Sequence, residues 1–509
     1  MSNKYYITTP IYYVNDKPHI GHAYTSVATD FIARFMTLKG YDVRFQTGTD
    51  EHGLKIQKAA EAKKIEPIEL CNQNSQIFRD LTVSLNLSNN DFIRTTEERH
   101  IDGASYLWKR LYERDQIYLG EYTGWYSIND ETFYNEKDLV KQNDGSFKTI
   151  TGGPVEWITE KSYFFKLSEW SDKLLKLYKN NPNFISPTSK RNEVIKFVES
   201  GLNDLSVSRT SFEWGIKTPT DDAHIMYVWL DALTCYANGV SYLNDKENEL
   251  KEYWKNVVHI VGKDILRHHA VYWPAFLLAA DLDLPKKIFA HGWWTNEGNK
   301  ISKSLGNVID PIEIINNYGL DQFRYFLLRE VPFGNDGDFS KNALINRINS
   351  DLVNDLGNLC QRSFSMIEKR LDSTIPQITN KGNEELLLDK SCEELLLKGS
   401  NLVNEFKIHD YIRLVWEYIG KVNKYFNDNK PWELEKNDND KFLNVLAVTV
   451  DQIKNIAIFI HPIMPDVSIK ILQIMGISET KLLFENMKAI NLHGNKLSRV
   501  NHLFNRVQS

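Results

Sequence analysis

Two short motifs supply side chains that could stabilise a nucleoside triphosphate while it reacts. The tetrapeptide from His19 to His22 reads His-Ile-Gly-His and provides two imidazoles. The pentapeptide that begins at Lys300 reads Lys-Ile-Ser-Lys-Ser and provides two ammonium groups, the second from Lys303. Hydrogen-bond donors and positive charges of this kind stabilise the charge that develops when the α-phosphorus of a triphosphate is attacked. The two motifs together predict nucleotidyl-transfer chemistry.

The local sequence places the histidine motif where a strand gives way to a helix. A helix N-terminus adds free amide N–H groups and a favourable dipole for phosphate. Gly21, between the histidines, lets the backbone approach a nucleotide closely. The alternative is that the tetrapeptide matches by chance and its imidazoles only cap a helix.

The lysine motif lies in a segment of small and polar residues that runs from Gly298 to Asn307. Lysine is a compact point charge that can follow a pyrophosphate group as it leaves, and Ser302 between the lysines adds a hydroxyl. The alternative is an exposed basic loop without a ligand. The presence of the histidine motif in the same chain favours the catalytic interpretation.

The elements around the first motif indicate an α/β domain. Residues 5–9 are aromatic and β-branched, and apolar residues then recur at helical spacing from Ala23 to Phe35, ending near Gly40. A second strand at residues 42–46 leads into the polar, glycine-containing segment 47–53. This alternation predicts a doubly wound parallel sheet with its ligand at the carboxyl ends of the strands.

Two changes of pattern suggest further domains. Short aromatic strands with turn signals between about Tyr118 and Thr220 indicate an inserted connective segment. The α/β pattern resumes with a strand at 257–261, a helix through Trp273 and a strand at 288–290 that leads to the lysine motif. After about Ser340 apolar residues repeat only at helical spacing, which predicts an all-α bundle.

The composition is that of a globular chain of several domains. The 509 residues are 42% hydrophobic and 25% charged, and the formal net charge is −6. No signal core or membrane-span-length apolar stretch is evident, and the four cysteines form no Cys-x-x-Cys pair, so we expect a cytoplasmic protein without a disulfide framework. Neither half of the chain is strongly basic, so an RNA partner would bind a local patch.

The motifs resemble those of class I aminoacyl-tRNA synthetases, with Ile301 in place of the methionine of the usual Lys-Met-Ser-Lys-Ser sequence. Four further segments narrow the resemblance to the methionyl-tRNA synthetase family: residues 9–15 (Thr-Pro-Ile-Tyr-Tyr-Val-Asn), 48–53 (Gly-Thr-Asp-Glu-His-Gly), 227–232 (Tyr-Val-Trp-Leu-Asp-Ala) and 262–265 (Gly-Lys-Asp-Ile). The resemblance covers essentially the whole chain.

The resemblance implies a two-step reaction, in which the methionine carboxylate attacks ATP and the terminal ribose hydroxyl of tRNA(Met), initiator or elongator, then attacks the methionyl adenylate. It implies that Asp50 pairs with the substrate ammonium and that the pocket for the methionine side chain is lined by Ile11, Tyr13, Trp229, Ala232, Leu233, Tyr236, Ile265, His269 and Trp273. The phosphates of ATP, with Mg²⁺, would bind to the histidine motif and the lysine motif. The adenosine would lie near Gly262, Asp264 and His291. Taken alone, Trp229 and Trp273 are better explained by ordinary core packing, and His269 by a satisfied helical histidine.

The resemblance also implies an anticodon-reading site in the helical domain, formed by Asn358, Arg362, Pro431 and Trp432. An unpaired base can stack on an exposed tryptophan and be read by amide and guanidinium donors. If Trp432 is considered alone, packing at a helix terminus explains it better. The expected domains are then 1–117 and 221–298 for the catalytic halves, 118–220 for the insertion, 299–345 for the lysine loop and stem-contact region, and 346–509 for the anticodon-binding domain.

Two departures from the pattern of many relatives carry expectations of their own. Residues 125–131 read Trp-Tyr-Ser-Ile-Asn-Asp-Glu where those relatives have zinc-ligating cysteines, so we expect no zinc and no other resident metal. The chain ends at Ser509 without an appended domain, which favours a monomer.

Three competing functions fit the sequence less well. Other class I synthetases with branched aliphatic substrates need a larger editing insertion, and the cysteine enzyme needs zinc-binding cysteines. A non-catalytic RNA-binding descendant would not need the intact histidines and lysines. A dehydrogenase lacks its Gly-x-Gly-x-x-Gly after the first strand.

Overall fold

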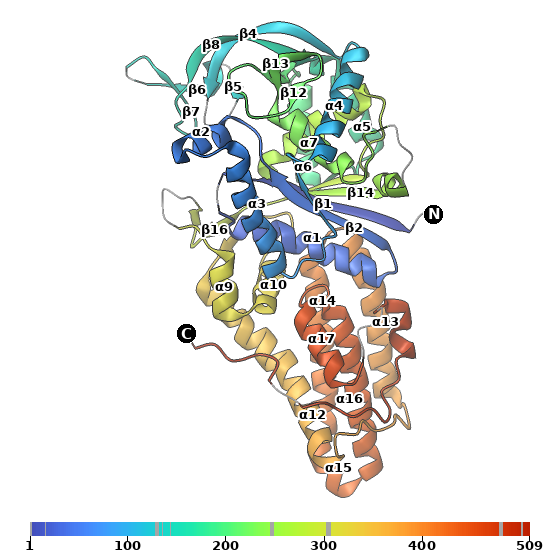
Figure 1. Cartoon of the computed structure of the whole chain (residues 1–509). Helices are drawn as coiled ribbons and strands as arrows, with labels where there is room; N and C mark the ends of the chain where they lie inside the picture. Colours follow the sequence, from blue (N-terminus) through green and yellow to red (C-terminus); the bar gives the residue numbers. More distant parts are fainter. Residues whose placement is uncertain are drawn as a thin grey trace. The chain divides into compact units, whose positions relative to one another are not determined.

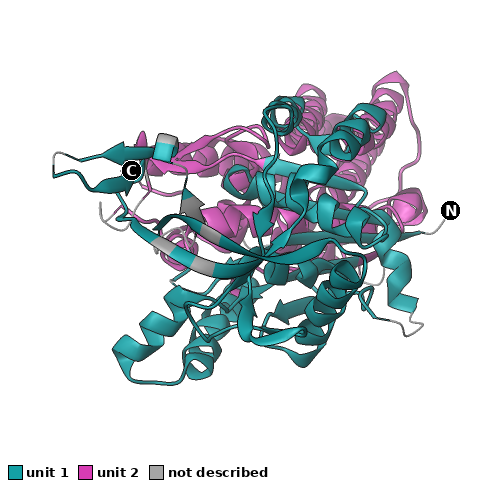
Figure 2. Cartoon of the chain, turned by 90° about the horizontal axis from the view of Figure 1, so that it is seen from above, with its two compact units in different colours: residues 1–18, 44–83, 89–290 teal, residues 19–43, 84–88, 291–509 magenta. Residues whose placement is uncertain are grey.

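The computed structural model describes residues 3–15, 17–127, 132–134, 136–142, 144–244, 249–301, 307–477, 482–499 and 502–508. The chain forms two compact units. Unit 1 contains residues 1–18, 44–83 and 89–290, and unit 2 contains residues 19–43, 84–88 and 291–509 (Figure 2). The domain ranges expected from the sequence stay a prediction.

Unit 1 is built on a six-stranded sheet with the order β3-β2-β1-β14-β15-β9. The pairs β1–β14, β2–β3 and β15–β9 are parallel, which confirms the predicted doubly wound α/β fold. Strand β2 continues to Asp50, beyond the expected end at residue 46, so its carboxyl end carries the polar motif itself. The strands of this sheet are β1 (Lys4–Tyr13), β2 (Asp42–Asp50), β3 (Asp91–Arg94), β9 (Ile185–Ser186), β14 (Val257–Gly262) and β15 (Lys287–His291).

The helices of unit 1 contribute to two main apolar cores, beside a small cluster of Leu54, Phe212 and Ile225. One core joins the sheet residues Tyr6, Ile93 and Val257 to α4, α7 and α8, and the other joins Tyr12 and Phe92 to α2 and α3. Burial of these faces removes apolar surface from water and is the main force that holds the helices in place. The helices are α2 (Leu54–Lys63), α3 (Pro67–Ser84), α4 (Glu98–Glu113), α5 (Ser171–Asn180), α6 (Thr188–Glu199), α7 (Val228–Asn238) and α8 (Trp273–Ala279), with 3-10 or π segments η1 (Glu136–Asp138), η2 (Leu167–Trp170), η3 (Glu249–Asn256), η4 (Lys263–Ile265) and η5 (His268–Tyr272).

The expected insertion does contain short antiparallel strands rich in aromatic residues. The long hairpin-like pair β4–β8 runs in register from Ile117 with Phe165 to Tyr126 with Glu156. Helices α5 and α6 and the two-residue strand β9 were not anticipated, and β9 pairs with β15 of the parallel sheet. The antiparallel strands are β4 (Ile117–Ser127), β5 (Thr132–Tyr134), β6 (Leu139–Lys141), β7 (Phe147–Thr149), β8 (Glu156–Phe165), β10 (Leu205–Ser206), β11 (Ser208–Arg209), β12 (Lys217–Thr218) and β13 (Asp221–Met226).

Unit 2 combines a small sheet, β17-β16-β18, with helices, and its long C-terminal helices run alongside one another (Figure 1). The last strand ends at Phe339, which confirms the predicted change to helical structure. The elements are α1 (Ile20–Leu38), β16 (Trp294–Asn296), β17 (Asn299–Lys300), α9 (Pro311–Tyr318), α10 (Leu320–Arg329), β18 (Gly337–Phe339), α11 (Lys341–Arg347), the π-helix η7 (Ile348–Gly357), α12 (Asn358–Arg370), α13 (Asn383–Asn404), α14 (Ile408–Asn429), α15 (Pro431–Asn437), α16 (Asn439–Ile460), α17 (Pro465–Ile474) and η8 (Phe484–Ala489).

Helix α16 is the most apolar of the long helices. Among the described residues it alone is long and apolar enough to cross a membrane, but 89% of its apolar window is buried inside the protein. Burial of that extent is typical of a core helix of the bundle.

Candidate active site

The wall of the expected methionine pocket is centred on a buried pair, Tyr236 and His269. Tyr236 Oη lies 2.6 Å from His269 Nε2, and His269 Nδ1 lies 2.9 Å from the carbonyl oxygen of Ile265. Because a carbonyl only accepts, Nδ1 carries the proton, and Nε2 of the neutral ring accepts from the tyrosine hydroxyl. Burial lowers the pKa of His269 to about 4, so the ring is neutral at pH 7.

Aromatic rings surround this pair. Trp229 stacks on His268 with ring centroids 3.6 Å apart and planes 11° apart, and its centroid lies 6.3 Å from that of His269. Trp273 lies edge-on to Tyr236 at 6.5 Å and is fully buried. The structure thus brings together four of the predicted pocket residues.

The other predicted pocket residues divide between the two cores of unit 1. Ala232 and Leu233 are buried on α7, and Ile11 and Ile265 pack against the same core as α7. Tyr13 packs instead against the core formed with α2 and α3.

Asp50 is the last residue of β2, so its carboxylate stands at the carboxyl edge of the parallel sheet, as expected. Its side chain is 9% exposed. Its carbonyl oxygen accepts a hydrogen bond of 3.2 Å from the amide of Val14, which ties it to the end of β1. At the same sheet edge, β14 ends at Gly262, which precedes the 3-10 helix η4, and Asp264 in η4 is exposed.

The histidine motif, in unit 2, forms the cap of helix α1. His19 Nδ1 accepts from the amide of Gly21 at 3.1 Å, and His22 Nδ1 accepts from the amide of His19 at 3.1 Å. Each Nδ1 therefore lacks a proton, and each neutral ring carries its proton on Nε2, where it can donate a hydrogen bond. Burial, followed by the neighbouring His19, lowers the pKa of His22 well below its usual value.

His291, expected near the adenosine, is linked to the same helix. Its Nε2 lies 2.8 Å from Thr25 Oγ1, and Thr25 Oγ1 donates to the carbonyl of Gly21 at 3.0 Å. The ring of Tyr24 lies edge-on to His291 at 5.2 Å. Within unit 2, His291 and the histidine motif thus form one connected group.

The lysine motif begins in the small sheet of unit 2. Lys300 ends β17 and pairs with Thr295 of β16. The amide of Gly298 donates to Asp338 Oδ1 at 2.8 Å, and Asn296 Nδ2 donates to the carbonyl of Asn307 at 2.9 Å, which fixes the two ends of the segment. The side chain of Lys300 and residues Ser302 and Lys303 lie outside the described part of the chain, so their predicted roles stay predictions.

Three of the expected anticodon residues gather in the helical bundle. Lys430 adopts φ +44° after α14, and Pro431 then begins α15 and is buried. Trp432 is 43% exposed, and the guanidinium of Arg362 lies 5.2 Å from its ring centroid. Arg362 Nη1 also donates to Asn427 Oδ1 at 2.8 Å, while Asn358 is exposed at the start of α12.

Comparisons with known proteins agree with this geometry. Residues 5–364 match the family described as tRNA synthetases class I (M), and residues 375–509 match the anticodon binding domain of methionyl tRNA ligase. The chain belongs to the methionyl-tRNA synthetase family. It is 51% identical to the methionine–tRNA ligase of Rickettsia conorii and 47% identical to that of Brucella suis, over 96% of this chain and 96% and 95% of those relatives.

Solved structures of the methionyl-tRNA synthetase family share the whole fold. The Mycobacterium tuberculosis methionyl-tRNA synthetase in complex with methionyl-adenylate is 45% identical, with a TM-score of 0.95 over 99% of this chain and 100% of that one. The apo form of the same enzyme gives a TM-score of 0.90 at 42% identity, over 100% of this chain and 99% of that one.

No group of three or more His, Cys, Asp or Glu side chains in the described part of the chain could hold a metal ion. Ser127 ends β4, and Asp130 lies outside the described residues. The expected lack of zinc in this member of the methionyl-tRNA synthetase family stays a prediction.

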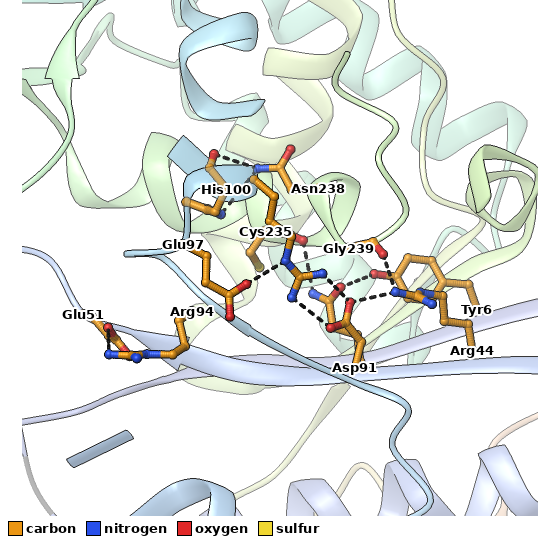
Figure 3. A network of polar contacts seen from close by, with 12 residues as sticks. Tyr6, Arg44, Glu51, Asp91, Arg94, Glu97, His100, Cys235, Asn238 and Gly239 are labelled. Carbon is orange, nitrogen blue, oxygen red and sulfur yellow. Dashed lines mark hydrogen bonds and ion pairs between the residues drawn. The ribbon is translucent and has the colours of Figure 1, made fainter. Parts of the chain in front are cut away.

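Sequence reasoning missed the buried polar contacts that support the pocket. Figure 3 shows Arg94 with Glu51, and Arg44 with Asp91 and the carbonyl of Gly239. Near them Asp231 lies 2.6 Å from both His52 Nδ1 and His100 Nε2. The segment 48–53 was singled out as a motif, but nothing local in the sequence connects it with residues 100 or 231.

Proposed function

We propose that this chain uses ATP to activate L-methionine as methionyl adenylate and transfers the methionyl group to the 3′ end of tRNA(Met), for initiation and elongation. The observation that carries the proposal is the neutral, hydrogen-bonded Tyr236–His269 pair among stacked aromatic rings. A pocket of this kind suits the thioether of methionine, because sulfur is polarizable and favours aromatic edges.

Methionine would be held at both ends. Its side chain would contact the aromatic wall of Trp229, Tyr236 and Trp273, with Ile11, Tyr13, Ala232, Leu233, Ile265 and His269 as the remaining lining. A neutral His269 avoids the cost of a buried charge beside an apolar ligand. The carboxylate of Asp50 would pair with the ammonium group of the substrate.

ATP would be bound by the remaining predicted residues: His19, Gly21, His22, Gly262, Asp264, His291, Lys300, Ser302 and Lys303. The methionine carboxylate is ionised at pH 7, so attack on the α-phosphorus needs no general base and catalysis depends on positioning and charge stabilisation. His19 and His22 would donate from Nε2, and the two lysines would neutralise the departing pyrophosphate. Mg²⁺ bound with ATP would neutralise phosphate charge.

The tRNA would be read by Asn358, Arg362, Pro431 and Trp432 on the helical bundle. The half-exposed ring of Trp432 offers a stacking face, and its contact with Arg362 adds a donor beside it. We infer a cytoplasmic monomer with catalytic halves 1–117 and 221–298, an insertion at 118–220, a lysine loop at 299–345 and an anticodon domain at 346–509.

The direct test is ATP–pyrophosphate exchange measured separately with each of the twenty amino acids. We expect exchange with methionine alone, followed by charging of a tRNA(Met) transcript. Faster exchange with another amino acid would reassign the substrate, and no exchange with any of them would favour the non-catalytic alternative.

A second test addresses the lysines. Lys300→Ala or Lys303→Ala should lower pyrophosphate exchange about a hundredfold while methionine binding, followed by calorimetry, stays nearly intact, because these charges act on the transition state. Unchanged exchange in both variants would contradict their assigned role.

A further inference from the structure

A buried carboxylate on α7 joins two histidines that come from different elements. Asp231 is fully buried, and its two oxygens lie 2.6 Å from His52 Nδ1 and 2.6 Å from His100 Nε2. His100 is fully buried in α4, and His52 is 6% exposed beyond the end of β2. Burial opposes ionisation of Asp231, but the two histidines outweigh it and hold the carboxyl pKa at about 2. Asp231 is therefore a fixed negative charge with both oxygens occupied.

One arm of this cluster leads directly to Asp50. His52 follows Asp50 by two residues, and Glu51 between them is fixed by Arg94 through bonds of 2.7 and 2.9 Å (Figure 3). The indole of Trp214 donates to the Glu51 carbonyl at 2.6 Å. The segment from Asp50 to His52 is thus connected to β3 through Arg94 and to α7 through Asp231.

The other end of the connection is the helix that carries the pocket wall. Trp229, Ala232, Leu233 and Tyr236 all lie on α7, within five residues of Asp231. The C-terminal end of α7 is tied separately, because Gln46 Nε2 donates to the Cys235 carbonyl at 3.1 Å and Tyr6 Oη donates to the Tyr236 carbonyl at 2.8 Å. Asp231 provides a direct side-chain tie between this helix and His52, two residues after Asp50.

We propose that Asp231, through His52, is a positioning residue that sets the spacing between the ammonium-binding carboxylate of Asp50 and the side-chain pocket on α7. The spacing selects amino acids by side-chain length. This inference rests on the proposed function, because it takes Asp50 and α7 as the two ends of the methionine site.

Replacing His52 and replacing His100 should have different effects on the choice of amino acid. His52 connects Asp231 to Asp50, whereas His100 connects it to α4, where Asn238 Nδ2 donates to the His100 carbonyl at 3.1 Å (Figure 3). Both histidines are buried and equally close to Asp231, so replacing either one disturbs the core similarly. Loss of the His52 arm removes the contact between Asp231 and the segment that contains Asp50, whereas loss of the His100 arm leaves that contact in place.

The experiment compares Asp231→Asn, His52→Gln and the matched control His100→Gln in ATP–pyrophosphate exchange. The substrates are L-methionine, L-ethionine with one additional methylene, and S-methyl-L-cysteine with one fewer. One methylene in an apolar pocket typically changes kcat/KM by about 10–200-fold. We expect Asp231→Asn and His52→Gln to raise the KM for methionine and to lower the preference for methionine over both analogues about tenfold, while the KM for ATP stays within about twofold.

The control should behave differently. His100→Gln should lower the melting temperature but keep the parent's preference among the three amino acids within about twofold. An unchanged preference in Asp231→Asn and His52→Gln, or an equal loss of preference in His100→Gln, would overturn the proposal. If the unmodified protein did not catalyse exchange with methionine, the proposed function would be wrong. That result is distinguishable from the two outcomes that overturn the role of Asp231, because both of those require an active parent.

Hydrogen–deuterium exchange on the unmodified protein gives a test that does not depend on the folding of any variant. Because the Asp231–His52 contact joins the two segments, saturating L-methionine should slow exchange in residues 50–53 and in residues 228–238 together. Protection of α7 without protection of residues 50–53 would overturn the proposal.

Discussion

At the start of α1, the same two histidines cap the helix and carry the predicted catalytic role. His19 and His22 satisfy backbone amides of the first turn through Nδ1, which leaves the proton of each neutral ring on Nε2. From the sequence, capping and catalysis were alternative roles for these histidines. In the structure the two roles are compatible, because capping uses Nδ1 and the proposed donation to a ligand uses Nε2. Capping fixes the ring orientation from which the proposed donation to phosphate would occur.

This geometry explains why Gly21 separates the histidines. A Cβ atom on Gly21 would lie 2.9 Å from His19 Cε1, so Gly21→Ala should displace the ring. We expect pyrophosphate exchange to fall about tenfold to a hundredfold, because one preorganised donor moves. Calorimetry should show little loss of stability, since alanine is the better helix former by about 1 kcal/mol.

Gly420→Ala is the matched control for that substitution. Its Cβ would meet no atom within 4 Å on helix α14, so both exchange and folding should be kept. A Gly21→Ala variant with the parent's exchange rate would show that the orientation of His19 is not needed.

A second residue, Asp321, should make stability depend on pH. It is 3% exposed, its Oδ2 accepts from the amide of Val467 at 2.6 Å, and burial raises its pKa to about 7. The folded protein therefore binds a proton at this carboxyl more tightly than the unfolded chain, whose carboxyl has a pKa of about 4. Its contribution to stability is present below about pH 4 and is lost as the pH rises to about 7.

Asp321→Asn removes this dependence while keeping the shape of the protonated acid. We expect the variant to be more stable than the parent by about 4 kcal/mol at pH 8, with the difference shrinking toward pH 4 in urea denaturation. Asp440→Asn serves as the control, because Asp440 is an exposed acid in the first turn of α16, and it should show no such trend. A constant difference between pH 4 and pH 8 would argue against a raised pKa.

At the scale of elements, the inserted segment is held by aromatic packing among its described residues. Trp125 of β4 lies 4.8 Å from Phe147 and 5.2 Å from Trp157 between ring centroids. Such pairs add to the free energy already gained by burying the rings. The strands can therefore be stabilised without a metal ion.

The corresponding prediction concerns zinc. Ser127 and Asp130 occupy positions where thiolates would be needed, and no cysteine lies between Cys71 and Cys235. Elemental analysis should find no stoichiometric zinc, and a chelator should leave the melting temperature unchanged. One zinc per chain, lost on chelation together with stability, would refute the expectation.

The sequence predicted those elements and residues whose signals are local. The strand–helix start at His19, the sheet-edge position of Asp50 and the helical region after about Ser340 all follow from patterns within a few residues. Helices α5 and α6 were missed because aromatic residues and turns dominate that segment. The Asp231 cluster was missed for a different reason: its members lie in three distant segments, and only the tertiary fold brings them together.

At the scale of the whole molecule, the proposed tasks are distributed over two units. Unit 1 carries the methionine pocket, and unit 2 carries the histidine motif, the lysine segment and the anticodon residues. The residues proposed for amino-acid activation therefore come from both units. The residues proposed to read the anticodon lie in the helical bundle of unit 2, so we expect the two activities to be separable by substitution.

Trp432 provides this separation. Its described contacts, Arg362 and Phe426, lie in the helical bundle, and no residue of the predicted adenylate site is among them. Stacking of one base on an aromatic ring is worth about 1–3 kcal/mol. Trp432→Ala should therefore lower charging of tRNA by about one to two orders of magnitude, while methionine-dependent pyrophosphate exchange stays within about twofold of the parent.

Two controls decide what a loss of charging means. Leu397→Ala removes an exposed apolar side chain from α13 in the same bundle and should charge normally. A transcript with its CAU anticodon altered should charge poorly with the parent and lose little further with Trp432→Ala, because the contact is already gone. If Trp432→Ala charged the normal transcript fully, or if calorimetry showed an unfolded bundle, Trp432 would be a packing residue at the start of α15. Base recognition would then have to come from other residues of the bundle.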